Sequence, residues 1–402
     1  MIVYLLVIAL ISCCVFSFDI NERKNNKSFW EKVVVLVLIL MAGLRNHVGS
    51  DSFNYEDTFY HSILPLKDYF SDVSWEDLRE PIWLLLMSTC KSICGSFVFF
   101  QIVHAVILNV LLYRFYKKMT NKVFTVFLIT FLVSWIGLNF EILRQSLCIA
   151  IFLNAVLLLR ERKILAYVIL SILMFGIHSF SIVIAIITPL ALFIKKKYIY
   201  PILLIAAFFV FFFVDETLLN LLFLQTEGVA NDDMQVRMNS YLTGGNYGYE
   251  NMNINGIIRL LTLNVFFPLS IVLLNKEDKA NKPNEFRSDK FMSLKVMQNS
   301  FVLLYMVIGL SASKLLIFFR FQQYFLPFII ISSVGIFYSK KKKGLLTVIF
   351  YLLFTIFVTD AVINLYKPSP GVNSPVPYDT RYFPYTSVFQ EEDQLRKRMW
   401  GL

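Results

Sequence analysis

The first residues that could carry chemistry follow directly after an apolar run. Arg45, Gly49, Asp51 and Tyr55 succeed one another at short spacings. A guanidinium can hold a phosphate through two parallel hydrogen bonds. Gly49 permits a tight turn, after which Asp51 could point its carboxylate back toward that phosphate. An interfacial anchor followed by a solvated loop is the alternative interpretation of this motif.

Two further candidates stand at the ends of apolar runs. Arg144, followed by Gln145, lies about one helical turn inside the run 142–159. A membrane-embedded Arg is costly unless it is paired or faces a polar cavity, which makes Arg144 a functional candidate; an i, i+3 pair with Glu141 is the structural alternative. His178 lies in the turn between two short apolar runs, where an imidazole can act as base or acid or simply be structural.

Arg320, with Tyr324 four residues later, and Arg259 also lie near the ends of apolar runs. Together with Arg45 and Arg144 they form a set of four Arg residues that we expect at similar depth on the outer face, where basic residues are usually scarce. Clustered guanidinium groups suit an anionic diphosphate attached to a lipid. Snorkelling toward the headgroups is the alternative, above all for Arg259.

The polar tail carries aromatic residues around Tyr378, which could stack on sugars or lie in the interfacial aromatic belt. Several motifs are missing from the sequence: a Walker A loop, a D-x-D triplet, H-E-x-x-H and G-x-S-x-G. The sequence therefore disfavours an ATP-hydrolysing protein, a glycosyltransferase that binds a nucleotide-sugar donor through a metal ion, and the usual membrane hydrolases. Neither a metal nor any other cofactor is expected.

The composition shows what must position these residues. Of 402 residues, 57% are hydrophobic and 16% are charged, and the mean hydropathy is +0.62. A helix needs about 20 apolar residues to cross a bilayer, so the sequence predicts an all-α polytopic membrane protein with about 12 transmembrane helices. A soluble enzyme, a disulfide scaffold and a nucleic-acid-binding domain are excluded. The net charge of +10 is attributed to Lys and Arg retained on the cytoplasmic side.

The apolar runs and the basic connections between them define a topology. The runs cover about 1–18, 33–44, 97–113, 123–138, 142–159, 164–178, 180–194, 198–214, 257–274, 296–312, 317–338 and 345–363. The first is interpreted as a retained span rather than a signal peptide. Basic connections lie at 19–32, 114–122, 160–163, 195–197, 275–295 and 340–343. The positive-inside rule places all six in the cytoplasm.

The remaining connections then face outward, within one integral membrane domain over 1–402. They include the loop 45–96, the loop 215–256 and the tail 364–402. The loop 215–256 carries six acidic residues and one basic residue, Arg237, in agreement with an outer location. The short apolar block 81–94 breaks the alternation if it spans; we favour a re-entrant helix there, which is allowed where protein buries it.

In this order and spacing the motifs resemble the EpsG family of Wzy-type polysaccharide polymerases. The resemblance rests on Arg45, Gly49, Asp51 and Tyr55, the Arg144–Gln145 helix, the His178 turn, Arg320 with Tyr324, and the late Pro-Tyr tail. It covers essentially the whole chain. Where an aromatic residue often follows the Arg in that family, this sequence has Asn46, His47 and Val48.

The resemblance implies a bacterial inner-membrane glycosyltransferase of GT-C-like, metal-independent character. It would join undecaprenyl-diphosphate-linked oligosaccharide repeat units (of O-antigen, capsule or exopolysaccharide) at the periplasmic face. Its partners would be membrane lipid, a chain-length regulator and a flippase, but no nucleic acid. The Arg set would stabilise the departing diphosphate, and His178 or Asp51 would take the acceptor's proton. Contacts to substrate would come from Tyr55, Gln145, Tyr324 and Tyr378.

Three other classes compete with this interpretation. A lipid-linked oligosaccharide flippase would share the helices and a cationic cavity, but transporters usually show internal repeats, and none is visible here. An O-antigen ligase performs the same chemistry on a different acceptor and is the hardest to separate. A membrane acyltransferase would want its His near the cytoplasmic side, whereas His178 is expected outside.

Overall fold

The computed structural model describes residues 2–49, 51–72, 80–193, 196–213, 254–275, 293–312, 317–339, 344–365, 382–383 and 385–390. Within these ranges the chain is helical, without a strand, which confirms the all-helical fold class. Most of the loop 215–256 and of the tail after 364, including Tyr378, lies outside the described residues.

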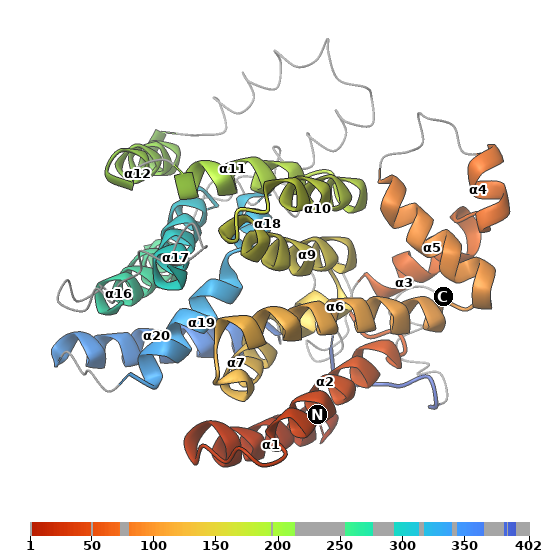
Figure 1. The fold of residues 1–402 in the computed structure, drawn as a ribbon, viewed down its shortest axis with the longest axis horizontal. Coiled ribbons are helices and arrows are strands. Elements are labelled where there is room, and N and C mark those ends of the chain that lie inside the picture. Colours follow the sequence, from red (N-terminus) through yellow and green to blue (C-terminus); the bar gives the residue numbers. More distant parts are fainter. Residues whose placement is uncertain are drawn as a thin grey trace, which may run out of the picture. The chain divides into compact units, whose positions relative to one another are not determined.

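The chain divides into two compact units, and each is considered by itself. Unit 1 combines Met1–Ala185 with Val358–Leu402, and unit 2 is Ile186–Phe357. The helices of unit 1 (Figure 1) are α1 (Ile2–Cys14), η1 (Val15–Ile20), α2 (Lys27–Gly43), α3 (Ser52–Asp57), η2 (Thr58–Ser62), α4 (Leu66–Asp72), α5 (Pro81–Cys94), α6 (Phe97–Met119), α7 (Val123–Thr130), η3 (Phe131–Trp135), α8 (Ile136–Phe140), α9 (Leu143–Arg160) and α10 (Ile164–Ile177). Helix α11 (Ser181–Phe193) begins in unit 1 and ends in unit 2.

Helix α9 forms the centre of unit 1. Apart from Arg144, Leu158 and Arg160, all of its residues are buried, and it packs against both α6 and α10. A helix that is apolar on every side belongs in such an interior. The amide nitrogen of its one Asn in mid-helix is paired, because Asn154 Nδ2 donates to the carbonyl oxygens of Leu111 and Ala150. Arg144, at the first turn, is thus positioned by the most buried helix of the unit.

Other helices expose apolar side chains. On α10, Leu165 and Ile172 are 74% and 63% exposed, and on α20 (Leu345–Leu365) Leu345 and Leu352 are 75% and 61% exposed. Large exposed apolar surfaces of this kind are avoided in water. Among the residues that the structure describes, seven helical segments are long and apolar enough to cross a membrane: Ile2–Ile20, Phe97–Met119, Val123–Phe140, Leu143–Arg160, Ile254–Leu274, Leu294–Ser311 and Leu345–Leu365. The protein is therefore a polytopic membrane protein.

The expected number of twelve spans stays a prediction. Shorter apolar helices occupy Pro81–Cys94, Ile164–Ile177, Ser181–Phe193 and Leu326–Phe337. A helix of 14 residues, such as α5, reaches only about 21 Å, less than the ~30 Å hydrocarbon core. This length suits the re-entrant interpretation of 81–94, but α10 has the same length. Length alone therefore does not distinguish α5 from the short helices expected to span.

Unit 2 is organised around a second buried helix. Its elements are α12 (Lys196–Phe213), α15 (Ile254–Leu261), η4 (Thr262–Phe266), α16 (Phe267–Leu274), α17 (Leu294–Ser311), α18 (Ile317–Gln322), α19 (Leu326–Phe337) and the first part of α20. Helix α17 packs against α12, α16, α18 and α19. A polar contact joins three elements, because Gln322 Nε2 donates to Asn264 Oδ1 at 2.7 Å and to the carbonyl of Tyr305 at 3.2 Å.

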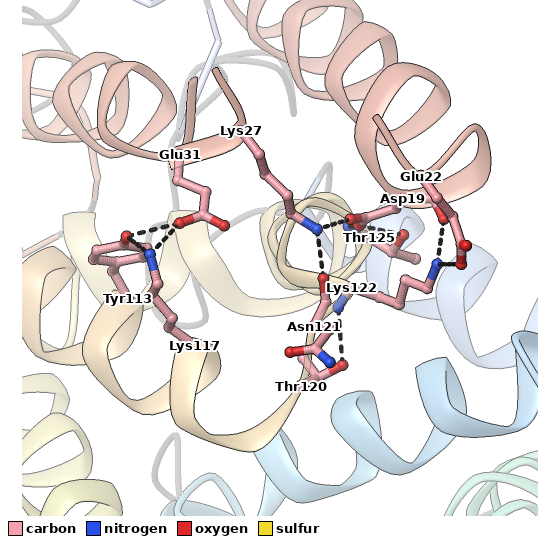
Figure 2. Close-up of polar contacts among 10 residues, drawn as sticks. All are labelled: Asp19, Glu22, Lys27, Glu31, Tyr113, Lys117, Thr120, Asn121, Lys122 and Thr125. Carbon is pink, nitrogen blue, oxygen red and sulfur yellow. Dashed lines mark hydrogen bonds and ion pairs between the residues drawn. The ribbon is translucent and has the colours of Figure 1, made fainter. Parts of the chain in front are cut away.

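Polar contacts tie two loops together at one end of unit 1 (Figure 2). Lys27, at the start of α2, donates to the carbonyl of Asn121 at 2.6 Å, and Lys122 pairs with Glu22 at 2.7 Å. The connections 21–26 and 120–122 therefore lie side by side. Both belong to basic segments that the charge pattern assigns to a common face of the membrane.

Candidate active site

The loop after α2 is shaped by Gly49. Its φ is +102°, and a Cβ atom at this position would lie 2.6 Å from the carbonyl oxygen of Phe140. A backbone in that region suits glycine, and the close approach leaves no room for a side chain. The tight turn predicted from the sequence is confirmed. It allows α3 to start at Ser52, three residues later, so that Asp51 directly precedes this helix and Tyr55 lies close to Arg144 in the first turn of α9.

Glu80 links two of the predicted site residues. It lies just before α5, whose first residue is Pro81, but its side chain makes no cap to this helix. Instead, Oε2 accepts a hydrogen bond from Arg144 Nη1, and Oε1 lies 2.8 Å from His178 Nδ1. One carboxylate thus bridges the start of α9 and the end of α10, although the two partners are 64 and 98 residues away in sequence.

The three groups differ in their access to solvent. The side chains of Glu80 and His178 are 11% and 10% exposed, whereas that of Arg144 is 43% exposed. Burial would raise the pKa of Glu80, but the hydrogen bond from His178 and the charge and hydrogen bond of Arg144 outweigh it and lower this pKa. Glu80 is therefore an anion at neutral pH. Because Arg144 is partly open, its guanidinium can also meet a ligand from outside.

Tyr55 completes the cluster. It lies close enough to Arg144 for each side chain to shift the pKa of the other, and its ring lies against that of Trp83 with centroids 5.9 Å apart. Burial raises the pKa of Tyr55, so the hydroxyl keeps its proton. The charge of Asp51 acts on Tyr55 as well, which places this carboxylate in the neighbourhood. We call Tyr55, Glu80, Arg144 and His178 the Glu80 cluster.

Arg45 is close to this cluster but buried. It is 1% exposed, its guanidinium lies 5.2 Å from the ring centre of Phe140, and Nη1 donates to the carbonyl of Ala42. Nε and Nη2 are buried without a hydrogen-bond acceptor among the described residues. Burial lowers the pKa of Arg45 to about 10, so it stays charged at neutral pH, and Tyr55 lies within range of its charge.

A segment from the end of the chain covers Arg45. Asn46 N donates to the carbonyl of Thr386 at 2.9 Å, and Val388 N donates to that of Leu44 at 3.0 Å. Arg45 and Ser387 form the isolated antiparallel bridge of unit 1. Residues more than 300 positions apart thus enclose the guanidinium, which explains why a side chain predicted near the surface is buried.

The other sequence-predicted residues are placed as follows. Gln145 is buried at the first turn of α9. Arg259 is exposed on α15, Arg320 is half-buried on α18, and Tyr324 is buried between α18 and α19. These three belong to unit 2 and are described within it alone. Tyr378 lies outside the described residues.

Two His residues near the cluster have partners of their own. His47, whose φ is +50°, pairs with Glu56 at 2.7 Å and stacks on Phe53. His104 lies in mid-helix on α6, where Nε2 is 2.9 Å from the carbonyl oxygen of Leu143. The structural role expected for His104 agrees with this contact.

Sequence reasoning did not identify Glu80. A signal was nevertheless present: an Arg inside an apolar helix requires a counter-ion, and Glu80 is the acidic residue that directly precedes the short apolar helix α5. The structure assigns that counter-ion to Glu80, which directly precedes α5, whereas the i, i+3 alternative considered for Arg144 was Glu141.

The helices and this buried charged cluster define a polytopic membrane protein with a candidate site at the helix ends. A family model matches residues 29–387, and the chain belongs to the EpsG family. Members of this family are Wzy-like polysaccharide polymerases. No curated protein and no solved structure gives a significant match to the chain.

Proposed function

We propose that the protein polymerises undecaprenyl-diphosphate-linked oligosaccharide repeat units at the periplasmic face of a bacterial inner membrane. Family membership supports a polysaccharide polymerase. The observation that carries the proposal for this chain is the Glu80 cluster, which combines a cation open to a ligand with an imidazole held by a carboxylate. This combination suits glycosyl transfer from a diphosphate leaving group.

In the proposed reaction, a hydroxyl of the acceptor repeat unit attacks the anomeric carbon of the lipid-linked donor chain. The new C–O bond forms as the bond to the diphosphate breaks, and the electron pair leaves with the diphosphate. Arg144 stabilises the charge that develops on this leaving group. The hydroxyl proton passes to His178, or to Asp51 if the carboxylate is the base.

The contact between Glu80 and His178 favours the imidazole as base. If His178 Nδ1–H donates to the carboxylate, Nε2 carries the lone pair and can accept a proton. Within the described part of the chain Nε2 has no hydrogen-bond partner. Glu80 then orients the ring and stabilises the imidazolium that forms, as an acidic partner does in a catalytic triad.

Arg45 is proposed as a second diphosphate-binding residue. Two nitrogen atoms of its guanidinium, Nε and Nη2, are buried without a hydrogen-bond acceptor among the described residues, which costs free energy that an anionic oxygen would recover. For a lipid diphosphate to reach these two nitrogen atoms, the segment 385–390 would have to move away from Arg45. Arg259 and Arg320 remain proposed diphosphate contacts on the basis of the sequence, and Gln145, Tyr324 and Tyr378 remain proposed substrate contacts.

A deletion strain tests the proposed activity. Its surface polysaccharide, separated on a gel, should lose the ladder of polymer lengths but keep a single repeat unit. Loss of every unit from the lipid core would instead indicate a ligase or a flippase. Complementation with the intact gene provides the control.

The proposed orientation needs a separate test. Single Cys residues introduced at 235 and 283 fall in the acidic loop 215–256 and the basic loop 275–295. In intact cells of a variant without its native Cys, a membrane-impermeant maleimide should label position 235 and not position 283. The reverse pattern would place the Arg set on the cytoplasmic side and would contradict a periplasmic site.

A further inference from the structure

A cavity of about 640 Å³ lies in unit 1 at the end of the bundle that holds the connection 21–26. The residues that line it form an apolar part and a cationic part. The apolar part comes from α1 and η1, and the cationic and amide part comes from the following loop, with a Trp of α2 beside it. The lining residues are Leu10, Cys13, Cys14, Ser17 and Phe18, then Arg23, Lys24, Asn25, Asn26 and Trp30.

The two cations of the lining face no carboxylate there. The acids adjacent in sequence have other partners (Figure 2). Glu22 pairs with Lys122 at 2.7 Å, and Asp19 is fully buried and accepts hydrogen bonds from α7 and α2. Arg23 and Lys24 are exposed at the cavity rim and have no ion-pair partner among the described residues. The rim is therefore a site of uncompensated positive charge.

The loop that carries these cations is held in a defined shape. Glu22 and Asn26 adopt left-handed backbone conformations, with φ of +52° and +60°, on either side of the loop. Arg23 N donates to the carbonyl of Ser17, and Lys27 Nζ ties the start of α2 to the carbonyl of Asn121. Because the backbone of this loop is already ordered, binding a ligand carries no cost of ordering the loop, and only the side chains of Arg23 and Lys24 lose freedom.

We propose that this cavity binds an anionic phospholipid. One acyl chain would lie against Leu10 and Phe18, and the phosphate would be held by Arg23 and Lys24. Trp30 would lie at the level of the glycerol, the depth at which Trp is enriched in membrane proteins. A free phosphate would leave the apolar wall unused, and a zwitterionic lipid would leave the rim uncompensated. Basic pockets beside membrane helices recognise anionic headgroups in this way.

The site is separate from the Glu80 cluster, and its test does not depend on polymerase activity. Binding of phosphatidylglycerol to the purified full-length protein in detergent is measured by native mass spectrometry. The double variant Arg23→Gln, Lys24→Gln should bind about 10- to 30-fold more weakly. Arg114→Gln, Lys118→Gln removes the same charge from exposed positions of α6 outside the cavity, and it should bind as the wild type does.

The apolar wall is tested by Cys13→Trp, which fills the cavity from an exposed position and should also weaken binding of phosphatidylglycerol. In nanodiscs that contain phosphatidylglycerol with brominated chains, the bromine atoms should quench the fluorescence of Trp30. The contribution of Trp30 is obtained by subtracting the fluorescence of the Trp30→Phe variant. Full binding by Arg23→Gln, Lys24→Gln, or equal weakening by both double variants, would overturn the site. Displacement of phosphatidylglycerol by an equal concentration of phosphatidylcholine or of undecaprenyl phosphate would overturn the proposed occupant.

Discussion

Oε1 of Glu80 lies 2.8 Å from Nδ1 of His178, and both side chains are nearly buried. The same carboxylate binds Arg144 through its other oxygen. A buried carboxylate is stable as an anion only when such partners compensate its lost hydration. Glu80 therefore couples Arg144, one of the four Arg residues predicted to hold the diphosphate, to His178, one of the two residues predicted as the base.

We expect Glu80→Gln to lower the polymerisation rate by about 100-fold or more, because a neutral amide cannot stabilise an imidazolium or hold Arg144 as a counter-ion. The rate is measured by incorporation of labelled repeat units into polymer in membrane vesicles, at protein levels matched by immunoblot. Glu56→Gln is the matched control, since Glu56 also pairs with a His, His47, at 2.7 Å. Equal losses in both variants would contradict a specific role for Glu80.

Arg144→Lys should not restore the activity that Arg144→Ala loses. A Lys keeps the positive charge but cannot bind Glu80 and a diphosphate oxygen together through a planar guanidinium. Loss of one charged hydrogen bond corresponds to roughly 1.5–3 kcal/mol, which is about 10- to 150-fold in rate. Arg160→Lys, at the other end of α9, should retain activity in the same vesicle assay. Wild-type turnover by Arg144→Lys would show that charge alone suffices.

Local patterns predicted much of this arrangement. The apolar runs identified the long apolar helices but not the short helices α3 and α4. Gly49 identified the turn, and the cost of an intramembrane Arg singled out Arg144. The contacts of Glu80 and the burial of Arg45 could not be predicted, because each depends on segments that pair across long distances in sequence. Amphipathic periodicity reports which face of a helix is buried, but it does not report which charged side chain from another helix reaches that face.

Gly49→Ala should reduce the amount of folded protein. The added methyl group would lie 2.6 Å from the carbonyl oxygen of Phe140, and its backbone would need φ near +102°. The left-handed conformation alone costs about 1–2 kcal/mol for a non-glycine residue, and the clash adds to it. Gly137→Ala is the control, since a Cβ there meets nothing within 4 Å. Fluorescence-detected size exclusion compares the melting temperatures, and equal values would contradict the assigned strain.

The identity of the base is tested by His178→Ala and Asp51→Asn. A general base typically contributes about 10²- to 10⁴-fold, far more than one hydrogen bond to a sugar. We therefore expect His178→Ala to abolish the polymer ladder at normal protein levels. Asp51→Asn should abolish it too only if Asp51 is the base. His61→Ala is the control, because His61 is 75% exposed and pairs with Asp57, outside the Glu80 cluster.

The pattern of losses assigns the proton acceptor. A full ladder from His178→Ala would make His178 structural and would transfer the role to Asp51, whose charge already acts on Tyr55. Full ladders from both variants would exclude each as the base. Positioning of the two lipid-linked substrates, with solvent as the proton acceptor, would then have to supply the rate, and the carboxylate of Glu80 would serve to hold Arg144 in place for the departing diphosphate.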